Sequence, residues 1–176
     1  EYALIKYRLY IEVTYLFKFI SLIKPVGYEN IIFLKEKFDE LISNFSHKEA
    51  SVIKNIETVT NHDVKAVEYY LKNKMTLWGL KNYTEFVHFG LTSQDINTSA
   101  VMLPLKNCLN NELFPLLDTL KEILTENISS WINVPMICRT HGQPASPSTV
   151  GKEYGVFFYR LEQQLKETVI LYTKFG

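Results

Sequence analysis

Apolar side chains recur at steps of three and four residues along most of this 176-residue chain, and this spacing narrows its possible folds the most. Such spacing places them on one face of a helix. The two longest stripes cover residues 105–128 and 150–169, and only seven Gly and six Pro interrupt the whole chain. A long helix cannot bury such a stripe by itself. The sequence therefore predicts an all-α, long-helix bundle with partner chains.

Two shorter helical patterns open the chain. Residues 2–23 carry an apolar stripe at helical spacing, and residues 28–44 repeat the pattern. Arg8 and Glu12 stand four positions apart, which allows an ion pair on the polar face of the first helix. We therefore expect two amphipathic helices in the first quarter of the chain.

Cap residues predict where the next two helices begin. Ser46 and Glu49 match a capping box, which predicts a helix over residues 47–60. Asp63 is a favoured N-cap residue and predicts a helix over residues 64–74. Both assignments rest on short local patterns.

The second half of the chain has its own cap and breaker residues. Thr92 and Asp95 fit a capping pattern at the start of a long helix, within which Pro104 and Pro115 should kink or split the chain. After an extended connection, Ser146-Pro147 predicts an N-cap and the first position of a last helix. We expect two partial domains, an N-terminal helical domain over residues 1–90 and the first part of a central helical bundle over residues 91–176.

Composition excludes several classes of partner. The formal net charge is zero and the isoelectric point is near 7.2, which argues against nucleic acid or a membrane surface as the partner. The most apolar stretch, residues 11–23, contains Glu12 and Lys18, so it does not predict a membrane span. Cys108 and Cys138 form neither a disulfide framework nor a zinc site. We expect a cytoplasmic protein with no metal and no cofactor.

Polar residues cluster at three helix boundaries, at residues 61–63, 92–95 and 139–143. Helix starts offer free backbone donors that suit carboxylates and phosphates. Three of the four histidines lie in or beside these clusters, and a histidine can transfer a proton near pH 7. The pattern predicts a polar site for an anionic small molecule. At residues 61–63, ordinary capping is the alternative interpretation, and it leaves His62 unexplained.

Three stretches carry a resemblance to a known family. They are Thr-Asn-His-Asp-Val-Lys-Ala-Val-Glu-Tyr at 60–69, Glu-Phe-Val-His-Phe-Gly-Leu-Thr-Ser-Gln-Asp-Ile-Asn at 85–97, and Arg-Thr-His-Gly-Gln-Pro-Ala-Ser-Pro-Ser-Thr-Val-Gly-Lys-Glu at 139–153. In order and spacing they resemble the adenylosuccinate lyases of the fumarase/aspartase superfamily. The Thr-Ser-x-Asp element points only to the superfamily, whereas the first and third stretches together point to this member.

The resemblance implies an enzyme of purine biosynthesis that cleaves a C–N bond by β-elimination and releases fumarate. Its substrates would be adenylosuccinate, which gives AMP, and the succinylated aminoimidazole carboxamide ribotide. The resemblance makes His141 the general acid that protonates the leaving nitrogen. It also implies that Asn61, His62 and Asp63 contact the nucleotide and its surroundings, and that Thr92 and Ser93 grip the succinyl carboxylates. Thr140 would be a further substrate contact next to His141, and His88 would line the site.

The residue types agree with this chemistry. Nitrogen is a poor leaving group unless it is protonated, and a positioned general acid such as His141 contributes about 10² to 10⁴ in rate. The intermediate gathers negative charge on a carboxylate. Hydroxyl and helix-start donors at Thr92 and Ser93 would stabilise that charge as it forms.

The resemblance also implies parts that these 176 residues do not contain. The family's general base is a Ser within a Ser-Ser-x-Met-Pro-x-Lys-x-Asn-Pro loop, and no such stretch occurs here. We therefore expect a truncated chain that is inactive by itself. In this superfamily each site is assembled from three subunits of a homotetramer, so we expect the apolar stripes to drive assembly.

Two alternatives stay open at this point. Another superfamily lyase, such as argininosuccinate lyase, shares the Thr-Ser and Thr-His elements but not the Asn-His-Asp-Val-Lys-Ala-Val-Glu run at 61–68. A non-catalytic helical assembly module would scatter the three histidines over unrelated surfaces. A comparison of AMP binding with arginine binding by the complete enzyme would distinguish adenylosuccinate lyase from argininosuccinate lyase. The positions of the three histidines in the assembled oligomer would test the assembly module.

Overall fold

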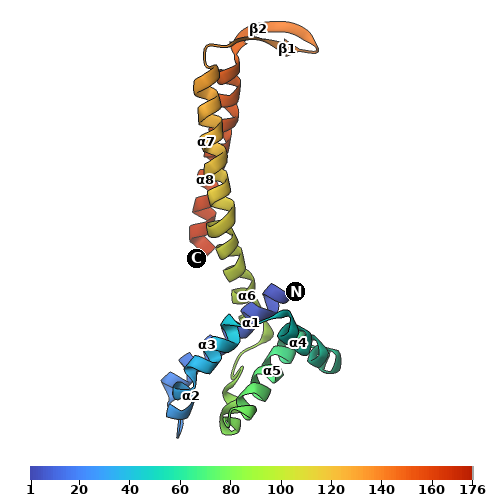
Figure 1. Cartoon of the computed structure of the whole chain (residues 1–176), viewed down its shortest axis with the longest axis vertical. Coiled ribbons are helices and arrows are strands. Elements are labelled where there is room, and N and C mark those ends of the chain that lie inside the picture. The colour runs from blue at the N-terminus through green and yellow to red at the C-terminus, as the bar shows by residue number, and fades with distance from the viewer. Residues whose placement is uncertain (176) are drawn as a thin grey trace. The chain divides into compact units, whose positions relative to one another are not determined.

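The computed structural model describes the backbone of residues 1–175 and the side chains of residues 1–168 (Figure 1). The contacts divide the chain into two units, Glu1–Leu105 (unit 1) and Lys106–Gly176 (unit 2). The predicted domain boundary between residues 90 and 91 stays a prediction. Helices dominate both units, and within the described residues no helix has the length and apolarity to cross a membrane.

Unit 1 is helical throughout and packs around its first helix. Its elements are α1 (Tyr2–Ile23), α2 (Glu29–Phe33), α3 (Lys35–Ser43), α4 (His47–Thr60), α5 (Asp63–Leu77), the 3₁₀ helix η1 (Lys81–Phe86) and most of α6 (Ser93–Cys108).

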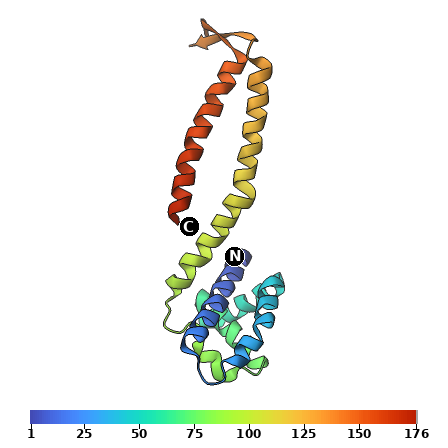
Figure 2. The same ribbon diagram turned by 90° about the vertical axis from the view of Figure 1, so that its left-hand side faces the viewer.

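The core of unit 1 lies along α1, which is the dark blue helix of Figure 2. Leu9, Leu16 and Ile20 of α1 are fully buried, and they belong to one cluster with Phe38 of α3 and Leu71 of α5. The helical spacing in the sequence therefore identified the buried face of α1 correctly.

Several predicted helix ends are confirmed and others are wrong. The Ser46–Glu49 capping box is present at the start of α4. The predicted helix over residues 28–44 is instead two helices, α2 and α3, which meet at Leu34. The N-cap of α5 is His62 rather than Asp63, which is the first residue of that helix.

The two charged residues expected on the solvent-facing side of α1 are buried instead. Arg8 and Glu12 do not form the predicted pair on a solvent-facing side of the helix. Arg8 is 8% exposed and Glu12 is 0% exposed, and each contacts a residue far away in the sequence. A buried charge needs a partner to compensate its lost hydration, so these contacts matter for the site described below.

The long helix predicted after Thr92 is split, as its prolines indicated. Pro104 lies inside α6, and the π-helical turn η2 (Leu109–Leu113) separates α6 from α7 (Phe114–Trp131). Pro115 lies in the first turn of α7, directly after this π turn, and has no backbone N–H to donate to the preceding turn. A π turn is rare, and it occurs mostly as a single wide turn inside an α-helix.

Unit 2 is a helical hairpin with a β-hairpin at its connection. Helices α7 and α8 (Val150–Phe175) run side by side in opposite directions, and strands β1 (Pro135–Thr140) and β2 (Gln143–Thr149) join them (Figures 1 and 2). Gly151 lets the two helices approach closely: a Cβ atom there would lie 2.6 Å from the carbonyl oxygen of Ile128.

Large apolar side chains remain exposed on both helices of unit 2. Examples are Leu116 and Ile123 on α7, and Phe157 and Tyr159 on α8. The side chain of Val169, at the end of the predicted stripe, lies outside the described residues. Two helices alone thus leave a large part of their apolar surface uncovered, as expected for members of a larger bundle.

Candidate active site

His141, the predicted general acid, lies at the tip of the β-hairpin. Strands β1 and β2 are antiparallel and pair Thr140 with Gln143 across a two-residue loop of His141 and Gly142. Both loop residues have positive φ, 50° for His141 and 76° for Gly142. Positive φ at both central positions is the signature of a type I′ turn, which matches the twist of paired strands. His141 therefore stands exposed at the end of a defined turn.

The hairpin replaces the predicted start of the last helix. Ser146 and Pro147 lie in β2, so their assignment as an N-cap and first helical residue is wrong. The ladder is irregular at this point, because Ala145 and Ser146 together lie opposite Cys138, which makes a β-bulge. Proline cannot donate a ladder hydrogen bond and is tolerated next to such irregularities.

Thr149, the residue before α8, is the N-cap of this helix. Its hydroxyl oxygen accepts a hydrogen bond from the backbone N–H of Lys152 at 3.3 Å, as an N-cap does. Glu153, in the first turn, ties the helix to the hairpin by accepting hydrogen bonds from Ser148 at 2.7 Å and from the Cys138 thiol at 3.7 Å. The hydrogen bond from Ser148, helped by Lys152, holds the pKa of Glu153 below its ordinary value.

In unit 1, His62 joins two of the three stretches that carry the family resemblance. Its Nδ1 atom accepts a hydrogen bond from the backbone N–H of Lys65 at 3.2 Å, which caps α5. Because Nδ1 is the acceptor, the hydrogen of the neutral ring lies on Nε2. Nε2 lies 3.2 Å from the hydroxyl oxygen of Ser93 and donates to it. The hydroxyl hydrogen of Ser93 therefore remains available for another acceptor.

Asp63 is held by a residue that the sequence analysis did not assign to the site. Nη2 of Arg8 lies 2.5 Å from Oδ2 of Asp63, and Nε of Arg8 donates to Oδ1 of Asn97 at 2.8 Å. Partial burial pushes the pKa of Asp63 up, but the hydrogen bond from the Val64 N–H and the charge of Arg8 outweigh it, so this pKa lies below its ordinary value. Arg8 thus connects α1 with the starts of α5 and α6.

Thr92 and Asp95 form the predicted cap of α6. Oδ2 of Asp95 accepts from the backbone N–H of Thr92 at 2.7 Å and from its hydroxyl at 3.0 Å. The backbone hydrogen bond lowers the pKa of Asp95 the most, and the hydroxyl adds to the effect. The hydroxyl hydrogen of Thr92 is therefore used inside the cap, unlike that of Ser93.

His88 contacts the second residue that the sequence analysis missed. Nδ1 of His88 lies 2.5 Å from Oε1 of Glu12, and the glutamate is fully buried in α1. His88 has a φ of 60°, which is uncommon for a residue other than glycine. No local pattern indicates this contact, because 76 residues separate the two positions.

Two predicted residues remain, Asn61 at the end of α4 and Thr140 at the end of β1. Asn61 ends α4 in a left-handed conformation, with a φ of 55°, and its backbone N–H donates to the carbonyl of Glu57 at 2.8 Å. Thr140 closes the hairpin turn in unit 2. Unit 1 thus brings His62 together with Ser93, and places Asp63 and His88 on buried residues of α1.

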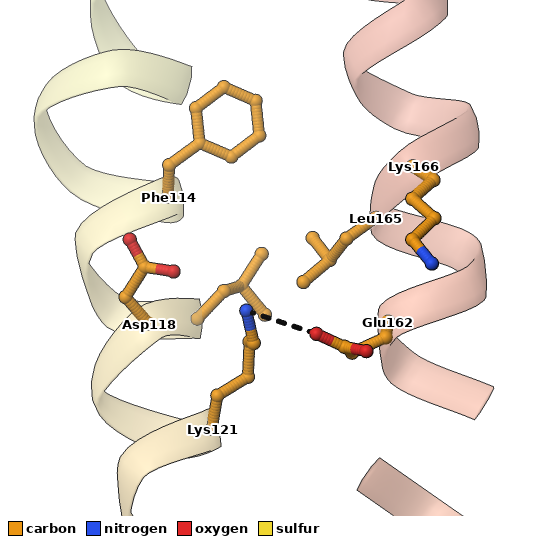
Figure 3. Close-up of a pocket in the computed structure, with 7 residues that line it drawn as sticks. Phe114, Asp118, Lys121, Glu162, Leu165 and Lys166 are labelled. Carbon is orange, nitrogen blue, oxygen red and sulfur yellow. Dashed lines mark ion pairs between the residues drawn. The ribbon is translucent and has the colours of Figure 1, made fainter. Parts of the chain in front are cut away.

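A cavity of about 610 Å³ between α7 and α8 contains none of the predicted residues. Figure 3 shows Lys121 and Glu162 pointing toward one another there, with Nζ and Oε1 3.6 Å apart, beside Phe114 and Leu165. Its mixed lining of apolar and charged side chains comes from the facing sides of the two helices. The polar clusters at the helix starts are therefore the better candidate for a site.

Comparison with known proteins decides the family. A family model described as Lyase matches residues 30–175. The chain belongs to this lyase family. Relatives named adenylosuccinate lyase are similar along nearly all of this chain: one from Dictyostelium discoideum is 44% identical over 100% of it, and one from Escherichia coli strain K12 is 38% identical over 95% of it. The chain spans 40% and 37% of the length of these two relatives.

Solved structures confirm the predicted fold class. A fumarate lyase from Mesorhizobium sp. BNC1 has a TM-score of 0.75 and a beta-carboxy-cis,cis-muconate cycloisomerase from Acinetobacter calcoaceticus sp. ADP1 one of 0.72. Both are 18% identical to this chain, over 95% and 94% of it and 37% of each of theirs. At this identity the likeness is one of fold alone, and that fold is the long-helix bundle of the fumarase/aspartase type.

Proposed function

We propose that the protein containing this chain cleaves the C–N bond of adenylosuccinate, and of the succinylated aminoimidazole carboxamide ribotide, by β-elimination. The observation that carries the proposal is the contact between His62 and Ser93, 3.2 Å long, which joins the stretches at 60–69 and 85–97. Both stretches occur in a chain that is similar to relatives named adenylosuccinate lyase. The products would be fumarate with AMP, or fumarate with the corresponding ribotide.

In the proposed reaction, a base removes a proton from the carbon next to the one that bears nitrogen. The C–N bond breaks as the C=C bond of fumarate forms, and His141 gives a proton to the leaving nitrogen. A type I′ turn suits this role, since it holds an exposed imidazole on a defined backbone. Thr140 next to it would contact substrate.

The residues of unit 1 would bind the anionic parts of the substrate. Ser93 has a hydroxyl hydrogen free to donate to a succinyl carboxylate, because His62 donates to its oxygen. Thr92 would contribute after exchanging its bond to Asp95. The Asn61, His62 and Asp63 group would contact the nucleotide and its surroundings, with His88 lining the site.

The decisive variant is His141→Asn in the full-length protein. Asn accepts positive φ more readily than most residues, so the turn should survive while the proton donor is lost. We expect kcat for fumarate release to fall by about 10² to 10⁴. His47→Asn, at an exposed position that stacks on Tyr2, is the control and should keep full activity. An unchanged kcat in His141→Asn would contradict the assignment.

The same protein can be tested against the two alternatives. If AMP raises its melting temperature and arginine does not, argininosuccinate lyase is excluded. A full-length protein that releases no fumarate from adenylosuccinate would favour a non-catalytic helical module. We also propose a cytoplasmic location, which fractionation of cells would test.

We also propose a homotetramer in which subunits share the sites. The exposed Leu116 and Phe157, each 66% exposed, support an assembly that covers these faces of α7 and α8. Sedimentation of the full-length protein should give a tetramer, and Phe157→Glu should weaken it. A stable monomer would contradict this part of the proposal.

A further inference from the structure

Glu12 is a charged residue that the fold buries completely, and the reaction proposed above gives it no role. Its Oε1 atom lies 2.5 Å from Nδ1 of His88. Its second oxygen, Oε2, has no hydrogen-bond partner among the described residues. A buried carboxylate is costly unless it is paired, so the contact with His88 is the interaction that compensates the burial of Glu12.

The lysines near Glu12 pair with another carboxylate, so His88 is the partner of Glu12. Lys65 and Glu68 of α5 face the same region, and Nζ of Lys65 lies 2.5 Å from Oε2 of Glu68. Lys72 binds the other oxygen of Glu68 at 3.0 Å, so this second carboxylate has its own two cations. Burial raises the pKa of Glu12, and the hydrogen bond and charge of His88 oppose the rise without cancelling it.

The backbone at His88 also brings the ring to Glu12. A φ of 60° is a conformation that costs energy for a residue with a side chain, and such residues gather at functional sites. The surrounding chain is anchored to α1 by a second contact, in which the hydroxyl of Tyr15 donates to the carbonyl of Phe89 at 2.7 Å. Asp95, at the start of α6, is a further acidic group whose charge interacts with His88.

We propose that Glu12 is a positioning residue for His88: it accepts the Nδ1 hydrogen and so leaves Nε2 as the ring nitrogen that meets the substrate. This inference rests on the proposed function, in which His88 lines the site. With Nδ1 occupied, the ring has one tautomer when neutral and one free nitrogen. An ionised Glu12 would also compensate the positive charge of His88 when an anionic substrate group binds at Nε2.

Ring-nitrogen NMR of the chain tests the tautomer directly. In the wild-type protein, neutral His88 should carry its hydrogen on Nδ1 and show a bare Nε2. Its signals are identified by their loss in His88→Asn. Glu12→Gln is nearly isosteric but offers both a donor and an acceptor, so the single tautomer should become a mixture. The exposed Glu36→Gln on α3 is the control and should change nothing.

Two outcomes of this measurement would overturn the inference. One is a wild-type His88 with its hydrogen on Nε2, a result that needs no variant. The other is an unchanged tautomer in Glu12→Gln. Glu12→Asp, which keeps the carboxylate, should retain more of the wild-type pattern than Glu12→Gln does.

Activity of the full-length protein provides the second readout. Glu12→Gln should lower kcat/KM for adenylosuccinate by about 10- to 100-fold, as loss of a group that orients a site residue commonly does. Glu12→Asp should recover part of that loss, and Glu36→Gln should match the wild type. An inactive wild-type enzyme would contradict the proposed function alone, and the tautomer would still decide on Glu12. An active wild type whose kcat/KM is unaffected by Glu12→Gln would contradict the inference alone.

Discussion

Gly151 and Gly155 make a matched pair for testing how closely α7 and α8 are packed. They lie one helical turn apart in α8, and the test replaces each of them separately with alanine. A Cβ at Gly151 would meet the carbonyl oxygen of Ile128 at 2.6 Å and the backbone nitrogen of Ile132 at 2.7 Å. A Cβ at Gly155 would meet nothing within 4 Å. The same added methyl group thus has no room at position 151 and free space at position 155.

The two substitutions should have opposite signs. Replacing glycine by alanine inside a helix stabilises it by up to about 1 kcal/mol, which is the result expected for Gly155→Ala. At Gly151 the same gain is opposed by overpacking, which costs roughly 1–3 kcal/mol when side chains can adjust. Here the obstructing atoms are backbone, so we take the upper end. Gly151→Ala should therefore destabilise unit 2 by about 2 kcal/mol net.

Urea unfolding followed by circular dichroism measures the global effect. Hydrogen exchange of the α7 and α8 amides measures the effect on unit 2 itself, and it remains informative if the two units unfold separately. Protection should fall in Gly151→Ala and hold or rise in Gly155→Ala. If Gly151→Ala were as stable as Gly155→Ala, the close approach of the helices would be refuted.

Three further predictions concern unit 1. Arg8→Met keeps the alkyl stem but loses the hydrogen bonds to Asp63 and Asn97. It should lower the free energy of unfolding by about 2–3 kcal/mol, less than the loss of a fully buried pair costs, because the Asp63 side chain is 44% exposed. A change below about 0.5 kcal/mol in chemical unfolding would contradict the contact. Ser46→Ala should remove the capping box and cost about 1 kcal/mol, while Ser51→Ala in the middle of α4 should cost less. The pKa of Asp63 is lower in the folded than in the unfolded chain, so the stability that its carboxylate contributes is present above the unfolded pKa and is lost as the pH falls through the folded pKa. Asp63→Asn should therefore lower the free energy of unfolding at pH 7, and this loss should shrink below about pH 4. A loss that does not change with pH would contradict this account.

Local patterns in the sequence predicted the helices well. The buried face of α1 and the capping box at Ser46 depend on residues within a few positions of each other, which a periodic pattern reveals. The split near Pro115 followed from the missing donor of proline. These features arise from interactions that a short stretch of chain determines by itself.

The hairpin around His141 could not be predicted in the same way. Its strands contain three prolines and are largely exposed, so they lack the alternation that marks a half-buried strand. Its turn uses His141-Gly142 where Asn-Gly is the strong signal. The pattern of Ser146 followed by Pro147 resembled a helix start, but Thr149 supplies the actual cap.

The partners of buried charges were also beyond local patterns. Arg8 and Asp63 are 55 residues apart, and Glu12 and His88 are 76 residues apart. A spacing of four residues on α1 suggested that Arg8 and Glu12 pair with each other. Only the packing of α1 against α5 and the loop before α6 shows that each has another partner.

The β-bulge in the hairpin bears on which changes in chain length the protein tolerates. Because Ala145 and Ser146 together face Cys138, deletion of either residue would restore a regular ladder. A deletion elsewhere in β2 would instead shift the register of the residues beside it, and a shift of one residue turns their side chains to the other face of the strand. Most substitutions in this ribbon alter one side chain, whereas one lost or added codon alters several at once. Deletion of Ala145 or Ser146 should therefore preserve more activity than deletion of any other single residue between Thr140 and Val150.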